Sequence, residues 1–307
     1  MIAVSDPPCY APGMRQLVAA MTLAALTSCS GPAAPRDPAH GKERIRDRFW
    51  IWCHEAGSHN TGWGLAGTSQ MTPVEGAAYL GVPNLLMIRY EGKPAPPFHQ
   101  AYVPFRPFRQ VVWSVVGAGG ATGEAERREV LRLAAREPNL TGVIMDDFFR
   151  DPKPGESIGT LSLGQIRDLR GNLTVDGRRL DLWVVLYDHQ LDLPVGPYLE
   201  LCDTITFWTW KADQLKDLEA NFAKAERLTP GKRRILGCYL YDYGRARPMP
   251  VEAMKAQCET GLRWLKAGRI DGMIFLASCI CDLDLEAVEW TRRWIAEVGD
   301  QPLPPGR

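Results

Sequence analysis

Leu140-Thr-Gly-Val-Ile-Met-Asp-Asp-Phe-Phe149 begins as an apolar run and ends abruptly in two adjacent carboxylates and two phenylalanines. A buried strand does not tolerate an unpaired carboxylate, because burial is costly or forces the group to take up a proton. Acidic residues directly after a buried strand are therefore typical of a site at the C-terminal rim of an α/β sheet or barrel. One Asp alone would favour a helix cap or a salt-bridged loop, whereas the pair Asp146 and Asp147 favours a site.

Apolar runs of strand length recur along the chain and alternate with amphipathic helical patterns. About eight such repeats in roughly 260 residues predict the α/β class and a single (βα)8 TIM barrel. Several runs are apolar throughout, as parallel strands are when both faces are covered. The expected strands are Arg48–Cys53, Leu85–Arg89, Gln110–Val116, Gly142–Asp146, Leu180–Tyr187, Thr204–Trp210, Ile235–Tyr241 and Gly272–Ser278. The expected helices include one that begins at Thr72, and Glu124–Glu137, Leu163–Leu173, Val195–Leu201, Lys211–Arg227, Met249–Lys266 and Leu285–Val298.

A doubly wound open sheet is the alternative fold. It is disfavoured because no Gly-x-Gly-x-x-Gly follows the first expected strand. Gly117-Ala-Gly-Gly120 follows the third strand but lacks the spacing of that fingerprint, so we interpret it as a plain turn. The segment Pro94–Pro107 is expected to be mostly irregular.

The N-terminal region has the layout of an export signal. A basic residue, a short apolar core and small residues occupy positions 15–30, and the core is too short to span a membrane stably. Leu26-Thr-Ser-Cys29 resembles the lipobox of bacterial lipoproteins, which implies lipidation of Cys29 and membrane anchoring on the periplasmic or extracellular face. An ordinary signal peptide with an incidental cysteine is the alternative. Residues 1–13 contain no apolar run, so Met14 is a candidate start.

We therefore expect four segments: a signal peptide with lipobox (1–29), a flexible tether (30–42), the barrel (43–299) and a C-terminal tail (300–307). The tether is expected because this stretch is rich in Pro, Ala and Gly. The formal net charge is zero and no block of five basic residues occurs, so nucleic acid is not an expected partner.

If the barrel is correct, the residues that follow each strand share one rim. Carboxylates and aromatic rings gather there, and this mixture describes a carbohydrate site better than a phosphate site, which would require backbone nests with Lys or Arg. The candidate catalytic carboxylates are Asp146, Asp147, Asp188, Glu55 and Asp242. The candidate substrate-binding residues are His54, Tyr187, Trp208, Trp210, Tyr241 and Tyr243.

Glycoside hydrolysis typically uses two carboxylates across one cleft. On a regular strand Asp146 and Asp147 point to opposite faces, so we expect one of them to pair with Glu55, Asp188 or Asp242. A bulge at the strand end would instead bring both inward.

Two motifs carry a family resemblance. Gly142-Val-Ile-Met-Asp-Asp-Phe148 and Tyr239-Leu-Tyr-Asp-Tyr243 resemble signatures of glycoside-hydrolase-type TIM barrels, including distant relatives of the chitinase group. In that group strand four reads Asp-Gly-x-Asp-x-Asp-x-Glu, with the Glu as acid. Asp146 matches the last Asp, while Ile144 and Phe148 stand where an Asp and the catalytic Glu belong. Chitinase chemistry is therefore not carried over.

These observations predict a glycoside hydrolase that acts by paired-carboxylate acid/base catalysis on a carbohydrate substrate, with no cofactor. A non-catalytic glycan-binding or scaffold barrel is the first alternative. A metal-dependent hydrolase is the second, with ligands from Asp147, His189, His54 and Glu55, although no His-x-His or His-Glu-x-x-His occurs.

The cysteines carry one structural expectation. Strand eight of a closed barrel pairs with strand one, so Cys53 and either Cys279 or Cys281 should be neighbours. A disulfide between them would link the first and eighth strands covalently where the barrel closes. Free buried thiols are the alternative.

Overall fold

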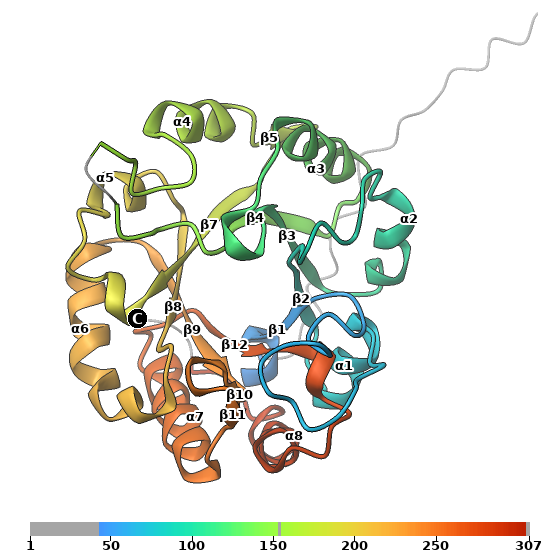
Figure 1. Ribbon diagram of the computed structural model, residues 1–307, viewed down its shortest axis with the longest axis vertical. Coiled ribbons are helices and arrows are strands. Elements are labelled where there is room, and N and C mark those ends of the chain that lie inside the picture. The colour runs from blue at the N-terminus through green and yellow to red at the C-terminus, as the bar shows by residue number, and fades with distance from the viewer. Residues whose placement is uncertain (1–42, 153–154, 305–307) are drawn as a thin grey trace, which may run out of the picture. The chain divides into compact units, whose positions relative to one another are not determined.

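Eight parallel strands close into a barrel in the computed structural model, which describes residues 43–152 and 155–304 (Figure 1). Their order around the barrel is β1-β12-β9-β8-β7-β4-β3-β2, and β1 pairs with both β2 and β12. The strands are β1 (Phe49–Cys53), β2 (Asn84–Met87), β3 (Gln110–Val116), β4 (Leu140–Met145), β7 (Asp181–Tyr187), β8 (Thr204–Trp208), β9 (Arg233–Tyr239) and β12 (Gly272–Leu276). This confirms the predicted (βα)8 TIM barrel, and the open sheet is excluded.

Helices follow the barrel strands and surround them (Figure 1). They are α1 (Pro73–Leu80), α2 (His99–Tyr102), α3 (Glu124–Arg136), α4 (Leu163–Gly171), α5 (Gly196–Leu199), α6 (Leu218–Leu228), α7 (Val251–Lys266) and α8 (Glu286–Val298). The predicted start of α1 is confirmed, because the Thr72 hydroxyl accepts from the Glu75 amide and the Glu75 side chain accepts from the Thr72 amide. The segment 94–107, expected to be irregular, contains one turn of α-helix and one of 3-10 helix.

Five strands end earlier than the sequence pattern indicated. β2 ends at Met87, β4 at Met145, β8 at Trp208, β9 at Tyr239 and β12 at Leu276. Beyond β9, Tyr241–Asp242 (β10) pairs with Arg247–Pro248 (β11) in a short hairpin. The predicted helix Lys211–Arg227 begins as a 3-10 helix at Ala212–Asp217 before α6.

The barrel interior is filled by tryptophans opposed by glycines. Trp52 and Trp208 meet edge to face at a ring separation of 5.3 Å, and both are almost fully buried. A Cβ atom on Gly237 would lie 2.1 Å from the Trp208 ring, so only glycine leaves room for this indole. The interior is thus a packed core up to the level of Trp208, which forms the floor beneath the C-terminal ends of the strands.

All six cysteines of the described residues are free and buried. Cys53 lies on β1 and Cys279 directly after β12, which pairs with β1, but no disulfide joins them. The free-thiol alternative therefore describes the structure.

The two ends of the described chain meet. Asp300 pairs with Arg44 and Arg46, and the Leu303 amide donates to the Glu43 carbonyl at 2.6 Å. Residues 300–303 of the expected tail thus contact the start of the barrel. The expected signal peptide, Cys29 and the tether lie outside the described residues. No helix among the residues that were described has the length and apolarity required to cross a bilayer.

Candidate functional site

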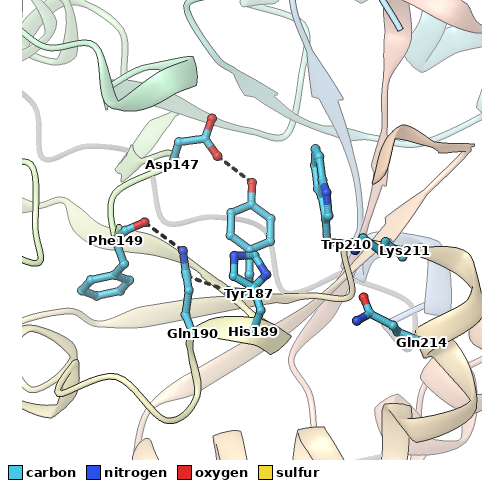
Figure 2. A pocket seen from close by; sticks show the side chains of 8 residues that line it. All are labelled: Asp147, Phe149, Tyr187, His189, Gln190, Trp210, Lys211 and Gln214. Carbon is cyan, nitrogen blue, oxygen red and sulfur yellow. Dashed lines mark hydrogen bonds between the residues drawn. The ribbon is translucent and has the colours of Figure 1, made fainter. Parts of the chain in front are cut away.

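Two adjoining hollows open at the C-terminal ends of the strands. The deeper one, here called the inner cavity, has a volume of about 80 Å³, and the outer groove has about 430 Å³. Asp147, Tyr187 and Trp210 line both of them. The other residues of the inner cavity are Trp52, His54, His59, Trp63, Tyr90, Ala118, Asp146, Trp208, Tyr239, Tyr243 and Leu276. The other residues of the outer groove are Phe149, His189, Gln190, Lys211 and Gln214 (Figure 2).

Both carboxylates of the predicted motif line the inner cavity. They do so because β4 ends at Met145 and Asp147 adopts a left-handed backbone with φ of 43°. Opposite this end of β4, the register of β3 shifts between Ser114 and Val116. The irregular strand end that we kept as an alternative is therefore present, and the regular-strand expectation of opposite faces is wrong here.

Asp147 is held by one hydrogen bond to each carboxylate oxygen. The Tyr187 hydroxyl donates to Oδ1 at 2.7 Å, as Figure 2 shows, and the Gly119 amide donates to Oδ2 at 2.8 Å. Both Asp147 oxygens thus serve as acceptors, as those of a carboxylate do. The Gly117–Gly120 segment, interpreted from sequence as a plain turn, therefore orients a residue of the site.

Asp146 differs from its neighbour. Its Oδ1 accepts from the Asp147 amide at 2.9 Å, and the side chain is buried. Burial, and secondarily the nearby Asp147, raises the pKa of Asp146 well above its usual range, which favours the protonated form of this carboxyl. Two carboxyl groups in different environments thus share one cavity, and such a difference is the usual basis for assigning an acid and a carboxylate role.

The two histidines of the inner cavity are neutral. The Ile88 carbonyl can only accept, so His54 Nδ1 carries the proton of their 2.9 Å hydrogen bond. His54 Nε2 is then the acceptor for the Trp52 indole at 3.3 Å. Burial lowers the pKa of His54 to about 4, and burial together with His54 lowers the pKa of His59 to about 3.

Four aromatic rings contact one another around a closed circuit, which we call the aromatic box. Its members are Trp63, Tyr243, Tyr239 and Trp210. Successive ring centroids are separated by 5.2, 5.5, 5.7 and 6.1 Å, and each pair is edge to face. Each ring lines the inner cavity, and Trp210 continues into the outer groove.

Four of the sequence candidates line neither cavity: Glu55, Asp188, Asp242 and Tyr241. Asp188 accepts from the amides of His189 and Trp210, so it orders the loop after β8. Asp242 is fully buried and accepts from the Ala212 amide and from Arg247. The Tyr241 hydroxyl donates to the carbonyls of residues 63 and 64. Glu55 is half-buried beyond the end of β1.

The other candidates lie where the sequence placed them. Tyr187 and Trp210 line both hollows, and His54, Trp208 and Tyr243 line the inner cavity. The site residues that the candidate set lacked are Trp52, His59, Trp63, Tyr90, Tyr239, Phe149, His189, Gln190, Lys211 and Gln214. Trp63 had no signal, because it comes from a long loop without periodicity between β1 and α1.

The proposed metal ligands do not converge. Across residues 43–152 and 155–304, no group of three or more His, Cys, Asp or Glu side chains is placed to hold an ion. His189 instead stacks on Tyr187 at a ring separation of 5.3 Å, on the wall of the outer groove.

No family model matches the chain, and no curated protein matches it. Among solved structures, a xylanase–α-amylase inhibitor protein in complex with trehalose aligns at a TM-score of 0.50 and 11% identity, covering 82% of this chain and 98% of that one. The GH113 β-mannanase of Alicyclobacillus acidocaldarius aligns at a TM-score of 0.47 and 13% identity, covering 83% of this chain and 98% of the mannanase. A domain of the Pyrococcus furiosus chitinase aligns at a TM-score of 0.48 and 12% identity, covering 77% of this chain and 85% of that domain. Identities this low show the shared barrel fold alone.

Proposed function

We propose that this barrel is a glycoside hydrolase whose acid is Asp146 and whose ionised carboxylate is Asp147. The observation that carries the proposal is the pair itself on one cavity: burial raises the pKa of Asp146, and two donors hold the oxygens of Asp147. In the reaction, Asp146 donates its proton to the glycosidic oxygen as the bond to the anomeric carbon breaks. Asp147 faces the positive charge that develops on the sugar ring and stabilises it. A water molecule then adds to the anomeric carbon and passes a proton to Asp146, which restores the acid.

The outer groove supports a sugar as the substrate. Its volume of about 430 Å³ is of the size that small ligands occupy. Tyr187, His189 and Trp210 present aromatic rings to it, while Gln190, Gln214 and Lys211 bring groups that can hydrogen-bond hydroxyls. Apolar faces with polar edges are what a pyranose ring offers in return.

A non-catalytic glycan-binding barrel is the second candidate. Phe148 stands where the chitinase group carries its acid, and it is fully buried against Phe149 and Tyr198, away from both hollows. The inhibitor protein with bound trehalose is a barrel of similar fold that is named as an inhibitor. Binding without turnover would identify this candidate.

The deciding experiment compares Asp146→Asn, Asp147→Asn and Asp192→Asn on a glycan panel. Asp192 is 90% exposed and lines neither hollow, so it controls for loss of a carboxylate. Each site variant should lower kcat by about 100- to 10,000-fold, the usual contribution of a proton-transfer group, while Asp192→Asn remains active. Unchanged turnover in both site variants would refute the proposal, and tight glycan binding with no turnover by the native protein would favour the second candidate.

We also propose that the protein is exported and anchored to the membrane through a lipid on Cys29, because the lipobox-like sequence supports it. Cys29→Ser should move the protein from the membrane fraction to the soluble fraction. An unlipidated Cys29 in the mature native protein would contradict the anchor.

A further inference from the structure

The inner cavity is rich in aromatic side chains and poor in positive charge. Ten of its lining residues are Trp, Tyr or His, and two are the carboxyl residues Asp146 and Asp147. Of the described residues that line it, none is Lys or Arg. Lys211 lines only the outer groove.

The charge of this cavity follows from its hydrogen bonds. His54 is neutral, because its two ring nitrogens are committed to a carbonyl acceptor and an indole donor. Asp147 accepts from Tyr187 and from the Gly119 amide, one hydrogen bond on each oxygen, as a carboxylate does. The cavity therefore presents one full negative charge beside the aromatic box and no compensating cation.

An aromatic box beside a carboxylate is complementary to an organic cation. The faces of Trp and Tyr rings carry negative electrostatic potential, and they attract an ammonium group within about 6 Å of the ring centroid. The attraction is larger when the cation is desolvated. A neutral or anionic group would gain nothing from Asp147 and, if anionic, would be repelled by it.

We infer that the inner cavity binds an ammonium group of the substrate, so that the glycan of the proposed function is one that carries a free amino sugar. The inference of a cation site depends on the aromatic box and Asp147. Only the identification of the ligand as a glycan rests on the proposed function.

The volumes support this division of the ligand. With a volume of about 80 Å³, the inner cavity is the much smaller of the two hollows and suits a substituent rather than a sugar ring. The outer groove of about 430 Å³ holds the ring itself. Trp210, which lines both, contacts ring and substituent.

The first test uses small probes and does not depend on glycan chemistry. Binding of choline, of methylammonium and of 3,3-dimethylbutan-1-ol, the uncharged isostere of choline, is measured by calorimetry on the full chain. At least one of the two cations should bind, with at least tenfold higher affinity than the uncharged isostere. Equal affinities, or no binding of either cation, would overturn the inference.

Matched variants at Trp63 sharpen this test. Trp63 is half-buried on a loop. The Tyr241 hydroxyl donates to the main-chain carbonyl of Trp63, so that substitution of the indole leaves this hydrogen bond in place. Trp63→Leu should abolish the preference for the cation, and Trp63→Phe should retain most of it. Equal effects of Leu and Phe would argue against a role for the aromatic face.

The second test separates the cation site from the hydrolase. Oligomers of glucosamine and of N-acetylglucosamine are compared by kcat/KM and by binding. At least tenfold preference for the free amine supports the inference. Equal or better use of the acetylated oligomer refutes it while leaving the hydrolase intact, whereas selective choline binding without use of any glycan refutes the hydrolase and retains the cation site.

Discussion

The Tyr187 hydroxyl donates a 2.7 Å hydrogen bond to Asp147 Oδ1 and so joins the end of β7 to the end of β4 at the mouth of the barrel. Tyr187→Phe keeps the ring and its stacking on His189 but leaves this oxygen without its donor. We expect a loss of stability of about 1–3 kcal/mol, the usual range for a hydrogen bond to a charged group, and a larger fractional loss of kcat than of binding. Chemical denaturation and steady-state kinetics provide the measurements. Activity equal to that of the native protein would show that Asp147 does not depend on this donor.

The glycine turn after β3 should be sensitive because it holds the other side of Asp147. Gly120 has φ of 72°, and an added Cβ would lie 2.8 Å from Thr160 Oγ1 and 3.2 Å from the Asp147 carbonyl. Gly120→Ala should therefore cost stability through both strain and crowding, and should lower activity by displacing Asp147. Gly177→Ala is the matched control, since Gly177 has φ of 74° with open space around it and should cost only the strain, about 1–2 kcal/mol. Equal effects of the two substitutions on stability and activity would show that the glycine turn does not position Asp147.

The barrel could be predicted because its strands are buried on both faces and hence apolar along their length. Val111 to Val116 on β3 is an example, with every side chain buried. The strand ends were less predictable. Aromatic residues continue past β8 to Trp210 and past β9 to Tyr243, because the mouth of the barrel is itself lined with rings. Hydrophobicity therefore does not mark where the ladder hydrogen bonds stop.

The location of the site could be predicted from the paired acids, but its composition could not. An Asp directly after a strand serves equally well as a site residue or as an acceptor for loop amides, and Asp188 and Asp242 do the second. The left-handed backbone at Asp147 has no sequence signal, since an Asp tolerates it only where the surrounding contacts require it. Trp63 reaches the site from a loop whose path depends on tertiary contacts.

Gly237 should be intolerant of any side chain because of Trp208. The 2.1 Å approach that a Cβ would make to the indole predicts that Gly237→Ala costs more than about 2 kcal/mol. Trp208→Leu in the same chain should recover part of that loss, so that the double variant is more stable than the sum of the single effects predicts. Gly171→Ala, with open space at the end of α4, should be neutral or slightly stabilising. Additive single effects would show that the two residues do not share this space.

The six described cysteines should be unreactive in the folded protein. They are buried, and burial raises the pKa of Cys202 and Cys279 to about 12, which suppresses the reactive thiolate. We expect an alkylating reagent to modify these six residues only in denaturant, and peptide mapping locates the modified residues. Reduction should not change the mass of the peptides that contain them. A reducible link between the peptides of Cys53 and Cys279 or Cys281 would show that the disulfide alternative holds.

The raised pKa of Asp146 predicts how the stability of the protein depends on pH. Its folded pKa lies above the unfolded value of 3.8, so the folded state binds the proton more tightly. The contribution of Asp146 to the stability of the native protein therefore decreases as the pH rises from its unfolded pKa to its folded pKa. Asp146→Asn does not titrate and retains an oxygen that accepts from the Asp147 amide. The stability of the variant relative to the native protein should thus rise by about 1.4 kcal/mol per pH unit in that window.

Subtracting the two curves removes the contributions of other groups. The lowered pKa values of His54 and His59 destabilise both proteins alike as pH falls below 6.5, because their unfolded forms take up protons first. The difference between native and variant, from denaturant titrations between pH 4 and pH 8, therefore isolates Asp146. A difference that stays flat across this range, or that falls with rising pH, would mean that Asp146 is ionised in the folded protein and is not the acid of the site.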